Sequence, residues 1–213
     1  MRCALIFVVT VLFFSLASAQ KKDEINFSDA YQLDSSEYFL IPRLLDDSNK
    51  DYFDKGKGYI LWGHYTDLLF YNTKTNQAKK LLEGKLALIS PFLQKRSYYY
   101  SQEKEQDLSN NILPKHIIYS ITTDDFNGDR VLDSNDPSYL YVSTKTGEQL
   151  RQITPNGFDV MSWTISKDKK IILVKGLTDK NKNKKFGNGD DQLFYRIDLD
   201  DDISKIQCYQ VNL

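Results

Sequence analysis

The sequence predicts an all-β fold made of antiparallel repeats, on three observations. Short runs rich in Tyr, Ile, Val, Phe and Thr recur from Tyr38 to the C-terminus, separated by turns of Asp, Asn, Gly and Lys; this is the composition of strands joined by tight turns. No window carries a convincing apolar period of 3.6 residues, so no long amphipathic helix is expected. A segment of strand, tight turn and strand also occurs three times along the chain.

The three copies of that segment align over nine residues each. They are residues 68–76 (LLFYNTKTN), 139–147 (YLYVSTKTG) and 193–201 (LFYRIDLDD). Their last residues are Asn, Gly and Asp, which accept the tight or left-handed backbone of a hairpin turn. Each turn leads into a polar–apolar strand such as residues 148–153, so each copy predicts a local antiparallel hairpin.

Further strands are expected upstream of each copy. Residues 58–65, 115–122 and 170–177 precede the three copies, and first strands are expected in residues 86–93 or 98–101 and in 160–166. The result is about three units of four strands, the composition of a propeller blade. Since propellers usually have four or more blades, three routes stay open: an unusual fourth unit in residues 26–45, a sandwich, or docking on a partner through open sheet edges. Polar residues 102–111 predict an exposed loop.

The later units carry a strand, an Asp-x-Asn-Gly-Asp-x-x-x-Asp loop, Leu-Tyr-Val, Thr-Gly and residues 152–156 (QITPN). This pattern, clearest over residues 115–212, resembles the repeats of TolB-type propeller proteins exported by bacteria. It implies a propeller-like architecture with calcium-like loops in the hairpins, and a binding or scaffolding role. The chain departs from that family in showing only about three units.

Residues 125–136 (DFNGDRVLDSND) have the composition of a calcium loop. A hard cation with six to eight oxygen ligands requires side-chain oxygens at positions 1, 3, 5, 9 and 12 and a backbone carbonyl at position 7. The four carboxylates of this segment repel one another unless a cation lies between them. The expected ligands are Asp125, Asn127, Asp129, Asp133 and Asp136, with the carbonyl of Val131.

The surroundings of this loop indicate which kind of calcium loop it is. Arg130 stands where an EF-hand has Gly, and a left-handed backbone there would cost about 1–2 kcal/mol. Asp136 replaces the long bidentate Glu, as in dockerin-like loops, and Leu132 at position 8 is expected to anchor the loop in the core. Both flanks are strand-like, so the sequence predicts a cation that holds a β-hairpin. The alternative is a solvated turn.

Residues 179–190 repeat the same spacing at the same place in their unit. Only two carboxylates are in register, and four lysines reduce the attraction for a cation, because affinity follows ligand charge. Water would replace a side chain at Gly187, and a weak or vestigial site is the alternative. The expected ligands are Asp179, Asn181, Asn183 and Asp190, with the carbonyl of Lys185.

The N-terminal residues predict export. A charged start, an apolar run over residues 4–16 and Ala17-Ser18-Ala19 have the layout of a secretory signal peptide. We therefore expect residues 1–19 to be a signal peptide, residues 20–213 to form one domain, and the protein to be periplasmic, extracellular or outer-membrane-associated. No other apolar run reaches the roughly 18 residues that cross a bilayer. Cys208 would then have no internal disulfide partner, and we expect it to be a small buried hydrophobe.

Composition and motifs argue against several function classes. A net charge of −1 lacks the basic excess of nucleic-acid-binding proteins. No Gly-x-Ser-x-Gly elbow, phosphate-binding Gly-rich loop or paired-Cys motif is present in the sequence. His64 and His116 are too few for a His-based zinc site and are expected to have hydrogen-bonded structural roles. Trp62, Trp163 and the tyrosines at 98–100 fit core packing better than stacking on sugars.

These features predict a non-enzymatic, exported β-repeat protein that binds Ca²⁺ in its hairpin loops and acts as an interaction or scaffold module in the cell envelope, where it has a protein partner. One alternative is a glycan-binding or glycan-degrading accessory protein, suggested by the aromatics and acidic turns; a carboxylate pair about 5–10 Å apart would favour hydrolysis. Another is a subunit of an outer-membrane complex, suggested by export, the lack of an anchor and open sheet edges.

Overall fold

The computed structural model describes residues 25–34, 36–44, 64–90 and 111–213. Within these ranges the protein is all-β and antiparallel, which confirms the expected fold class. The expected signal segment, most of the strand expected at 58–65, Trp62, the tyrosines at 98–100 and residues 102–110 lie outside the described residues. No helix in the described part of the chain is long and apolar enough to cross a membrane.

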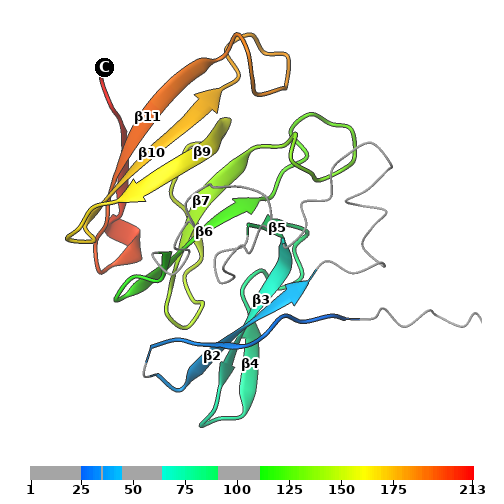
Figure 1. The fold of residues 1–213 in the computed structure, drawn as a ribbon, viewed down its shortest axis with the longest axis vertical. Coiled ribbons are helices and arrows are strands. Elements are labelled where there is room, and N and C mark those ends of the chain that lie inside the picture. Colours follow the sequence, from blue (N-terminus) through cyan, green and yellow to red (C-terminus); the bar gives the residue numbers. More distant parts are fainter. Residues whose placement is uncertain (1–24, 35, 45–63, 91–110) are drawn as a thin grey trace, which may run out of the picture.

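The strands form two sheets (Figure 1). The large sheet has the order β1-β2-β3-β5-β6-β7-β8, with β4 also paired to β3, and the C-terminal sheet has the order β12-β11-β10-β9. The 3-10 helix η3 (Ile203–Lys205) precedes the last strand. The strands are β1 (Tyr31–Gln32), β2 (Tyr38–Leu44), β3 (Tyr65–Asn72), β4 (Gln77–Lys80), β5 (Leu88–Ile89), β6 (His116–Thr122), β7 (Ser138–Thr144), β8 (Arg151–Gln152), β9 (Phe158–Ile165), β10 (Ile171–Thr178), β11 (Asp191–Asp198) and β12 (Gln207–Gln210).

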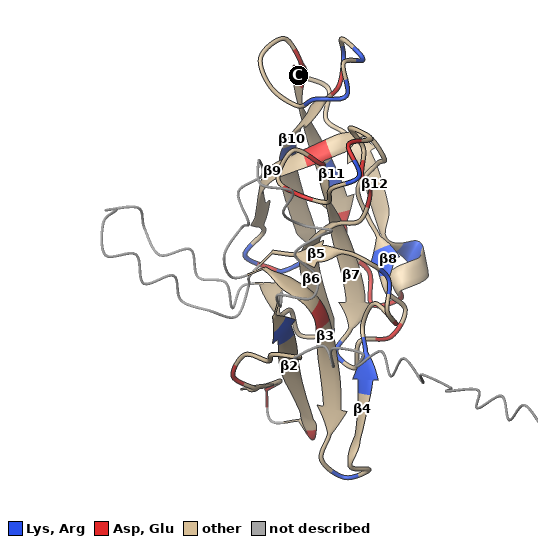
Figure 2. Ribbon diagram, turned by 90° about the vertical axis from the view of Figure 1, so that its right-hand side faces the viewer, with Lys and Arg blue, Asp and Glu red and all other residues tan. Residues whose placement is uncertain are grey.

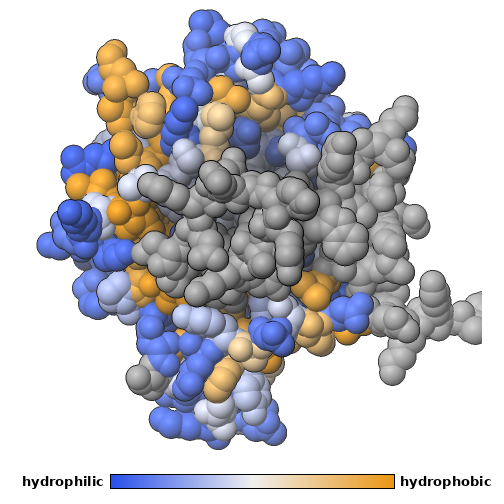
Figure 3. All heavy atoms as spheres, viewed as in Figure 1, coloured by the Kyte–Doolittle hydropathy of each residue, from blue (hydrophilic) through white to orange (hydrophobic). Residues whose placement is uncertain are grey.

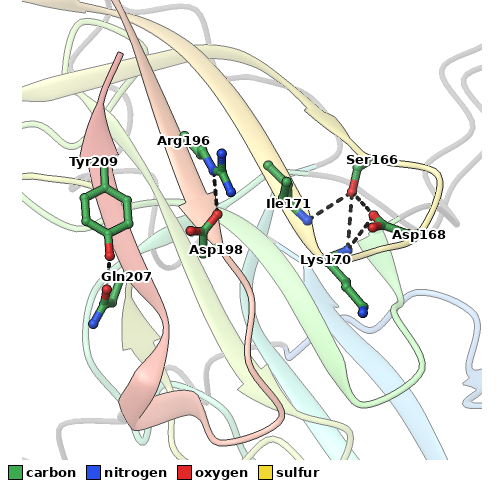
Figure 4. A network of polar contacts seen from close by, with 8 residues as sticks. All are labelled: Ser166, Asp168, Lys170, Ile171, Arg196, Asp198, Gln207 and Tyr209. Atoms are coloured by element: carbon green, nitrogen blue, oxygen red, sulfur yellow. Dashed lines mark hydrogen bonds and ion pairs between the residues drawn. The ribbon is translucent and has the colours of Figure 1, made fainter. Parts of the chain in front are cut away.

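The C-terminal sheet corresponds to the predicted third unit. Its four strands follow one another in the chain and in the sheet, and β10 pairs with β11 over eight residues. Two side chains stabilise the turn between β9 and β10 by accepting hydrogen bonds from its backbone N–H groups. Ser166 Oγ accepts a hydrogen bond from the N–H of Ile171 (3.0 Å), and Asp168 Oδ1 accepts one from the N–H of Lys170 (3.2 Å) (Figure 4). Such short polar side chains favour turns for this reason.

The first two units share one sheet. β5 pairs with β3 through Tyr65 and Ile89 and also pairs with β6, so hydrogen bonding continues from one unit into the next. β2 pairs along the whole of β3. Residues 38–44 therefore belong to the first unit, and the described residues between 26 and 44 form no separate fourth unit. The described strands do not close into a barrel or a propeller.

β6 lies between two hydrophobic clusters, and all its residues are buried. Ile117, Tyr119 and Ile121 pack in a cluster with residues of β2 and β3, whereas Ile118 points the other way, into a cluster with residues of β7, β9, β10 and β11. This alternation follows from the two-residue period of a strand. Polar atoms here need internal partners, and Tyr119 Oη lies 2.6 Å from Ser143 Oγ.

Two glycines are required by close backbone approaches. Gly147, in the turn after β7, has a φ of 74°, and a Cβ there would lie 2.4 Å from Cδ2 of Phe70 in the first unit. A Cβ on Gly176 would lie 2.2 Å from the carbonyl oxygen of Asp159, next to a shift in the register of β9 and β10. Real Cβ atoms do not approach so closely, so the fold needs glycine at both positions.

The outer face of the C-terminal sheet carries exposed apolar side chains. Met161 is 52% exposed, Leu173 43% and Tyr209 48%. On the same face, Arg196 Nε lies 2.6 Å from Asp198 Oδ1 (Figure 4). Figure 3 shows apolar side chains gathered beside β11 and the C-terminal end of the chain, below a hydrophilic cap formed by the loop after β10. This sheet therefore has one buried face and one partly apolar open face.

Candidate metal-binding loops

Both candidate loops join the second and third strands of a unit. Residues 125–136, the first loop, connect β6 to β7, and residues 179–190, the second loop, connect β10 to β11. Both lie at the same end of the molecule (Figure 1). Their flanks are strands, as the sequence predicts, so neither loop lies between the two helices of an EF-hand.

The two loops share a left-handed backbone at positions 4 and 6. The φ angle is 78° at Gly128 and 59° at Lys182 for position 4, and 69° at Arg130 and 60° at Lys184 for position 6. An EF-hand has Gly at position 6, so Arg130 departs from that pattern, yet its backbone is left-handed all the same. Residues with a Cβ adopt it at a cost of about 1–2 kcal/mol each. Other interactions within the loops must therefore offset this cost.

Those interactions are hydrogen bonds from the loop backbone to the side chains at positions 1, 3, 5 and 12. The pattern is the same in both loops. The side chain at position 1 accepts from the N–H groups at positions 5 and 6, and the side chain at position 3 accepts from position 5. The side chain at position 5 accepts from position 7, and the side chain at position 12 accepts from positions 2 and 9. In the first loop they join Asp125 Oδ1 to Asp129 N (3.0 Å), Asp125 Oδ2 to Arg130 N (2.8 Å), Asn127 Oδ1 to Asp129 N (2.8 Å), Asp129 Oδ1 to Val131 N (2.8 Å), Asp136 Oδ1 to Phe126 N (2.9 Å) and Asp136 Oδ2 to Asp133 N (3.1 Å).

The second loop repeats each of these hydrogen bonds at the equivalent position. They join Asp179 Oδ1 to Asn183 N (3.0 Å), Asp179 Oδ2 to Lys184 N (2.9 Å), Asn181 Oδ1 to Asn183 N (3.0 Å), Asn183 Oδ1 to Lys185 N (2.8 Å), Asp190 Oδ1 to Lys180 N (3.2 Å) and Asp190 Oδ2 to Gly187 N (2.9 Å). The repeated spacing in the sequence therefore corresponds to a repeated three-dimensional loop. In each copy, the side chains at positions 1, 3, 5 and 12, which are the expected ligands, accept hydrogen bonds from the backbone of their own loop.

The side chain of Asp133, at position 9 of the first loop, takes no part in this shared set of hydrogen bonds, to which only its backbone N–H contributes. Its Oδ1 accepts from the N–H of Asn135 (2.7 Å), and its Oδ2 accepts from Asn135 Nδ2 (3.1 Å). Asp133 is nevertheless buried close to Asp136, with exposed fractions of 5% and 4%. Burial raises the pKa of Asp136 to about 6; backbone hydrogen bonds oppose this rise, and the charge of Asp133 adds to it. A cation beside these two carboxylates would relieve their repulsion.

The donor sets of the loops are mixed. In the described ranges, no three or more His, Cys, Asp or Glu side chains are grouped so that they could hold a metal ion, so the structure does not bring the four aspartates of the first loop around one point. The sets expected here also use asparagine side chains and the backbone carbonyls of Val131 and Lys185. Carboxylate, amide and carbonyl oxygens suit a hard cation such as Ca²⁺ and not the soft metals that prefer thiolates.

Position 8 anchors each loop, but on different neighbours. Leu132 is 4% exposed and packs with Leu88 of β5, which confirms the predicted anchor. Phe186 in the second loop packs instead on Phe126 of the first loop, with ring centroids 5.1 Å apart and an interplanar angle of 39°. This contact is not predicted from the sequence. The only signal for it is an aromatic residue in each loop, and nothing in the spacing says that the two meet.

The other residues singled out from the sequence have structural roles. His116 Nε2 lies 2.7 Å from the carbonyl oxygen of Asp200, and His64 Nε2 lies 3.4 Å from Ser90 Oγ; both rings are buried. Trp163 packs against the second cluster. Cys208 packs there too, and burial raises its pKa to about 11, which keeps the thiol neutral at pH 7. The histidines therefore have the expected hydrogen-bonded structural roles, whereas Trp163 and Cys208 are only partly buried at the edge of the core.

No protein-family model matches the chain, and no curated protein or solved structure is detectably similar to it. What the protein does is therefore inferred from the chemistry of its loops and surfaces. The two hairpin loops offer the most specific chemistry in the described part of the chain.

Proposed function

We propose that this protein is an exported, non-enzymatic β-repeat protein that binds Ca²⁺ in its first loop and serves as an interaction or scaffold module of the cell envelope. The observation that supports cation binding is the equivalence of the two loops. They share left-handed residues at positions 4 and 6 and the same hydrogen bonds to the side chains at positions 1, 3, 5 and 12. The same oxygen-bearing side chains on the same backbone in two copies favour a shared ligand over two unrelated solvated turns.

The ligands of the first loop would be Asp125, Asn127, Asp129 and Asp136, with the carbonyl of Val131 and the nearby carboxylate of Asp133. Asp125 Oδ2, Asp129 Oδ1 and Asp136 Oδ2 each accept one backbone N–H, and an oxygen that accepts one N–H keeps a further lone pair for a cation. The bound ion would offset the repulsion of the buried Asp133–Asp136 pair. Because Ca²⁺ would bind this arrangement only in the folded chain, the binding free energy would add to stability.

The second loop is proposed as the weaker site. It has the same backbone but only Asp179 and Asp190 as charged ligands, and its exposed lysines repel a cation. The first loop should therefore fill first as the calcium concentration rises.

We also propose a propeller-like, blade-repeat architecture related to the TolB-type propellers. Support comes from the C-terminal sheet, whose four antiparallel strands follow the strand order expected of one blade. The stacking of this sheet on β6 and β7 through an apolar interface also fits blade-to-blade packing.

An interaction role is supported by the open face of the C-terminal sheet. Met161, Leu173 and Tyr209 are exposed there beside the Arg196–Asp198 pair, and apolar groups among charged ones are common at protein interfaces. The same face suits a subunit of an outer-membrane complex. A pull-down from native membranes tests this second candidate function. A subunit of an outer-membrane complex would recover membrane proteins that co-purify in fixed stoichiometry, whereas a freely secreted protein would not.

Thermal unfolding in the presence of Ca²⁺ and in the presence of a chelator tests whether Ca²⁺ binds and stabilises the protein. The informative variant is Asp129→Asn, because Asn183 occupies the equivalent position in the second loop and makes the same hydrogen bond to the backbone. The variant should therefore keep the loop and lose a charged ligand. Asp29→Asn, at an exposed site outside both loops, is the matched control.

At a Ca²⁺ concentration about 100 times Kd, binding should add about 2.7 kcal/mol to the stability of the wild type and the control. For a chain of this size this raises Tm by about 5–10 °C. Asp129→Asn should show less than half of that rise at the same concentration. Equal melting of the wild type with and without Ca²⁺ would refute the structural role of the cation.

A further inference from the structure

The two loops carry opposite charges where they meet. Four aspartates and one arginine give the first loop a net charge of −3, whereas four lysines and two aspartates give the second loop +2. Figure 2 shows lysines in the loop at the top of the molecule, after β10. Opposite charges on neighbouring loops attract each other, and the strength of the attraction depends on the distance between the charged side chains.

Lys184 is a side chain of the second loop that reaches the first. Its Nζ would lie 3.8 Å from a Cβ placed on Gly128, at position 4 of the first loop. Lys180, by contrast, pairs with Asp191 of β11 at 2.8 Å. The ammonium of Lys184 is thus placed beside the backbone turn that would surround the cation.

The contact of Phe186 with Phe126 holds this arrangement. Phe186 comes two residues after Lys184 and Phe126 two residues before Gly128, so the ring contact at 5.1 Å brings these two positions together. Aromatic pairs at this separation attract each other beyond the burial of their area. The second loop is therefore held against the first by its own anchor residue.

We propose that Lys184 is an internal competitor of Ca²⁺ at the first loop. In the calcium-free protein its ammonium partly neutralises the acidic loop and stabilises the contact between the loops. When Ca²⁺ binds, the same ammonium repels it, so the affinity of the first loop is lower than its own ligands would provide. This inference rests on the proposed function, since it concerns the regulation of that cation site.

Lys184→Gln tests the competition, and Lys182→Gln is the matched control. Both variants remove one positive charge from the same loop, and both residues are exposed with nearly equal φ angles, 60° and 59°. Calorimetric titration with Ca²⁺ should show binding to the first loop that is roughly three- to tenfold tighter in Lys184→Gln, as expected for charges separated by several ångströms at a protein surface. Lys182→Gln should change Kd less than about twofold.

Melting in chelator is the second readout, and it requires no cation. Lys184→Gln should melt at a lower temperature than Lys182→Gln, because it loses an attraction to the calcium-free first loop. In a Phe186→Ala background the two glutamine variants should behave alike in both measurements. Equal effects of the two variants in the wild-type background would overturn the inference, and so would a Lys184 effect that survives Phe186→Ala unchanged.

The outcomes separate this inference from the proposed function. If no variant binds Ca²⁺, the proposed function fails, while the melting temperatures in chelator still decide whether Lys184 neutralises the first loop. If Ca²⁺ binds to all variants with equal affinity, the cation site stands and the role of Lys184 is refuted.

Discussion

Arg130 adopts a backbone conformation that glycine reaches at lower cost. Its φ is 69° and its side chain is exposed. Arg130→Gly should remove about 1–2 kcal/mol of strain and increase the entropy of the unfolded chain by about 0.5–1 kcal/mol. We expect a net gain of up to about 1.5 kcal/mol in the free energy of unfolding, measured by urea denaturation in chelator.

Lys167→Gly is the matched control for that variant. Lys167 is also exposed and cationic, but it is not among the residues with positive φ. Glycine there brings the entropic cost without relief of strain, so stability should fall by about 0.5–1 kcal/mol. Equal changes in the two variants would mean that the left-handed backbone of Arg130 stores no strain.

Asp67 on β3 is a carboxylate that the structure buries away from the loops. It is 2% exposed, and its Oδ1 accepts from the N–H groups of Leu68 (2.8 Å) and Leu82 (3.0 Å). Burial raises its pKa, against the opposing effects of these hydrogen bonds and of the charges of Lys80 and Arg43. The folded protein therefore binds this proton more tightly than the unfolded chain does.

The sign of the pH dependence follows. The stability that protonation of Asp67 provides is fully present below the ordinary pKa of 3.8 and is lost as pH rises through the raised pKa of the folded protein. Asp67→Asn keeps an acceptor oxygen and stays neutral, so it should match the wild type in acid and exceed it in stability at neutral pH. Urea unfolding of both proteins from about pH 3 to about pH 8 measures this. A difference that does not change with pH would contradict the assignment.

At the scale of the element, β10 depends on Gly176. A Cβ there would meet the Asp159 carbonyl at 2.2 Å and the Phe158 ring at 2.5 Å. Gly176→Ala should therefore force β9 and β10 apart at their register shift and cost about 3 kcal/mol or more, since overpacking commonly costs 1–3 kcal/mol even when the contact is with a side chain that can move. Chemical denaturation gives the value.

Gly187→Ala provides the comparison for Gly176→Ala. A Cβ on Gly187 has no atom within 4 Å, and its φ is not in the left-handed range. Alanine should be neutral there or stabilise by about 0.4–1 kcal/mol through the unfolded chain. A small effect at Gly176 would show that the two strands can move apart at little cost.

The hairpins could be predicted from the sequence because each is local. β6–β7 and β10–β11 pair across one loop, and the Tyr-rich runs and Asp/Asn/Gly turns that define them lie within a few residues of each other. The equivalence of the two loops could be predicted for the same reason, since the spacing of Asp and Asn within twelve residues is visible in the sequence. Leu132 was predicted as an anchor because position 8 of such a loop faces inward.

At the scale of the whole molecule, the sequence is less informative. The bridge from β3 through β5 to β6 depends on a two-residue strand whose partners are distant in the chain, and such a short apolar run gives no periodic signal. The burial of Asp67 and the contact of Phe126 with Phe186 likewise depend on which elements pack together. Local composition does not specify which distant residues become neighbours, so these features are seen only in the structure.

The position of β6 has a consequence for how the chain acquires its structure. Its seven buried residues are covered on one side by strands that end before it begins and on the other by strands that follow much later, up to β11. Contacts of such long sequence separation slow folding, and neither neighbour can be omitted without opening an apolar surface to water. Despite its repeats, the protein is therefore expected to assemble as one cooperative whole, in contrast to a solenoid that can grow one module at a time.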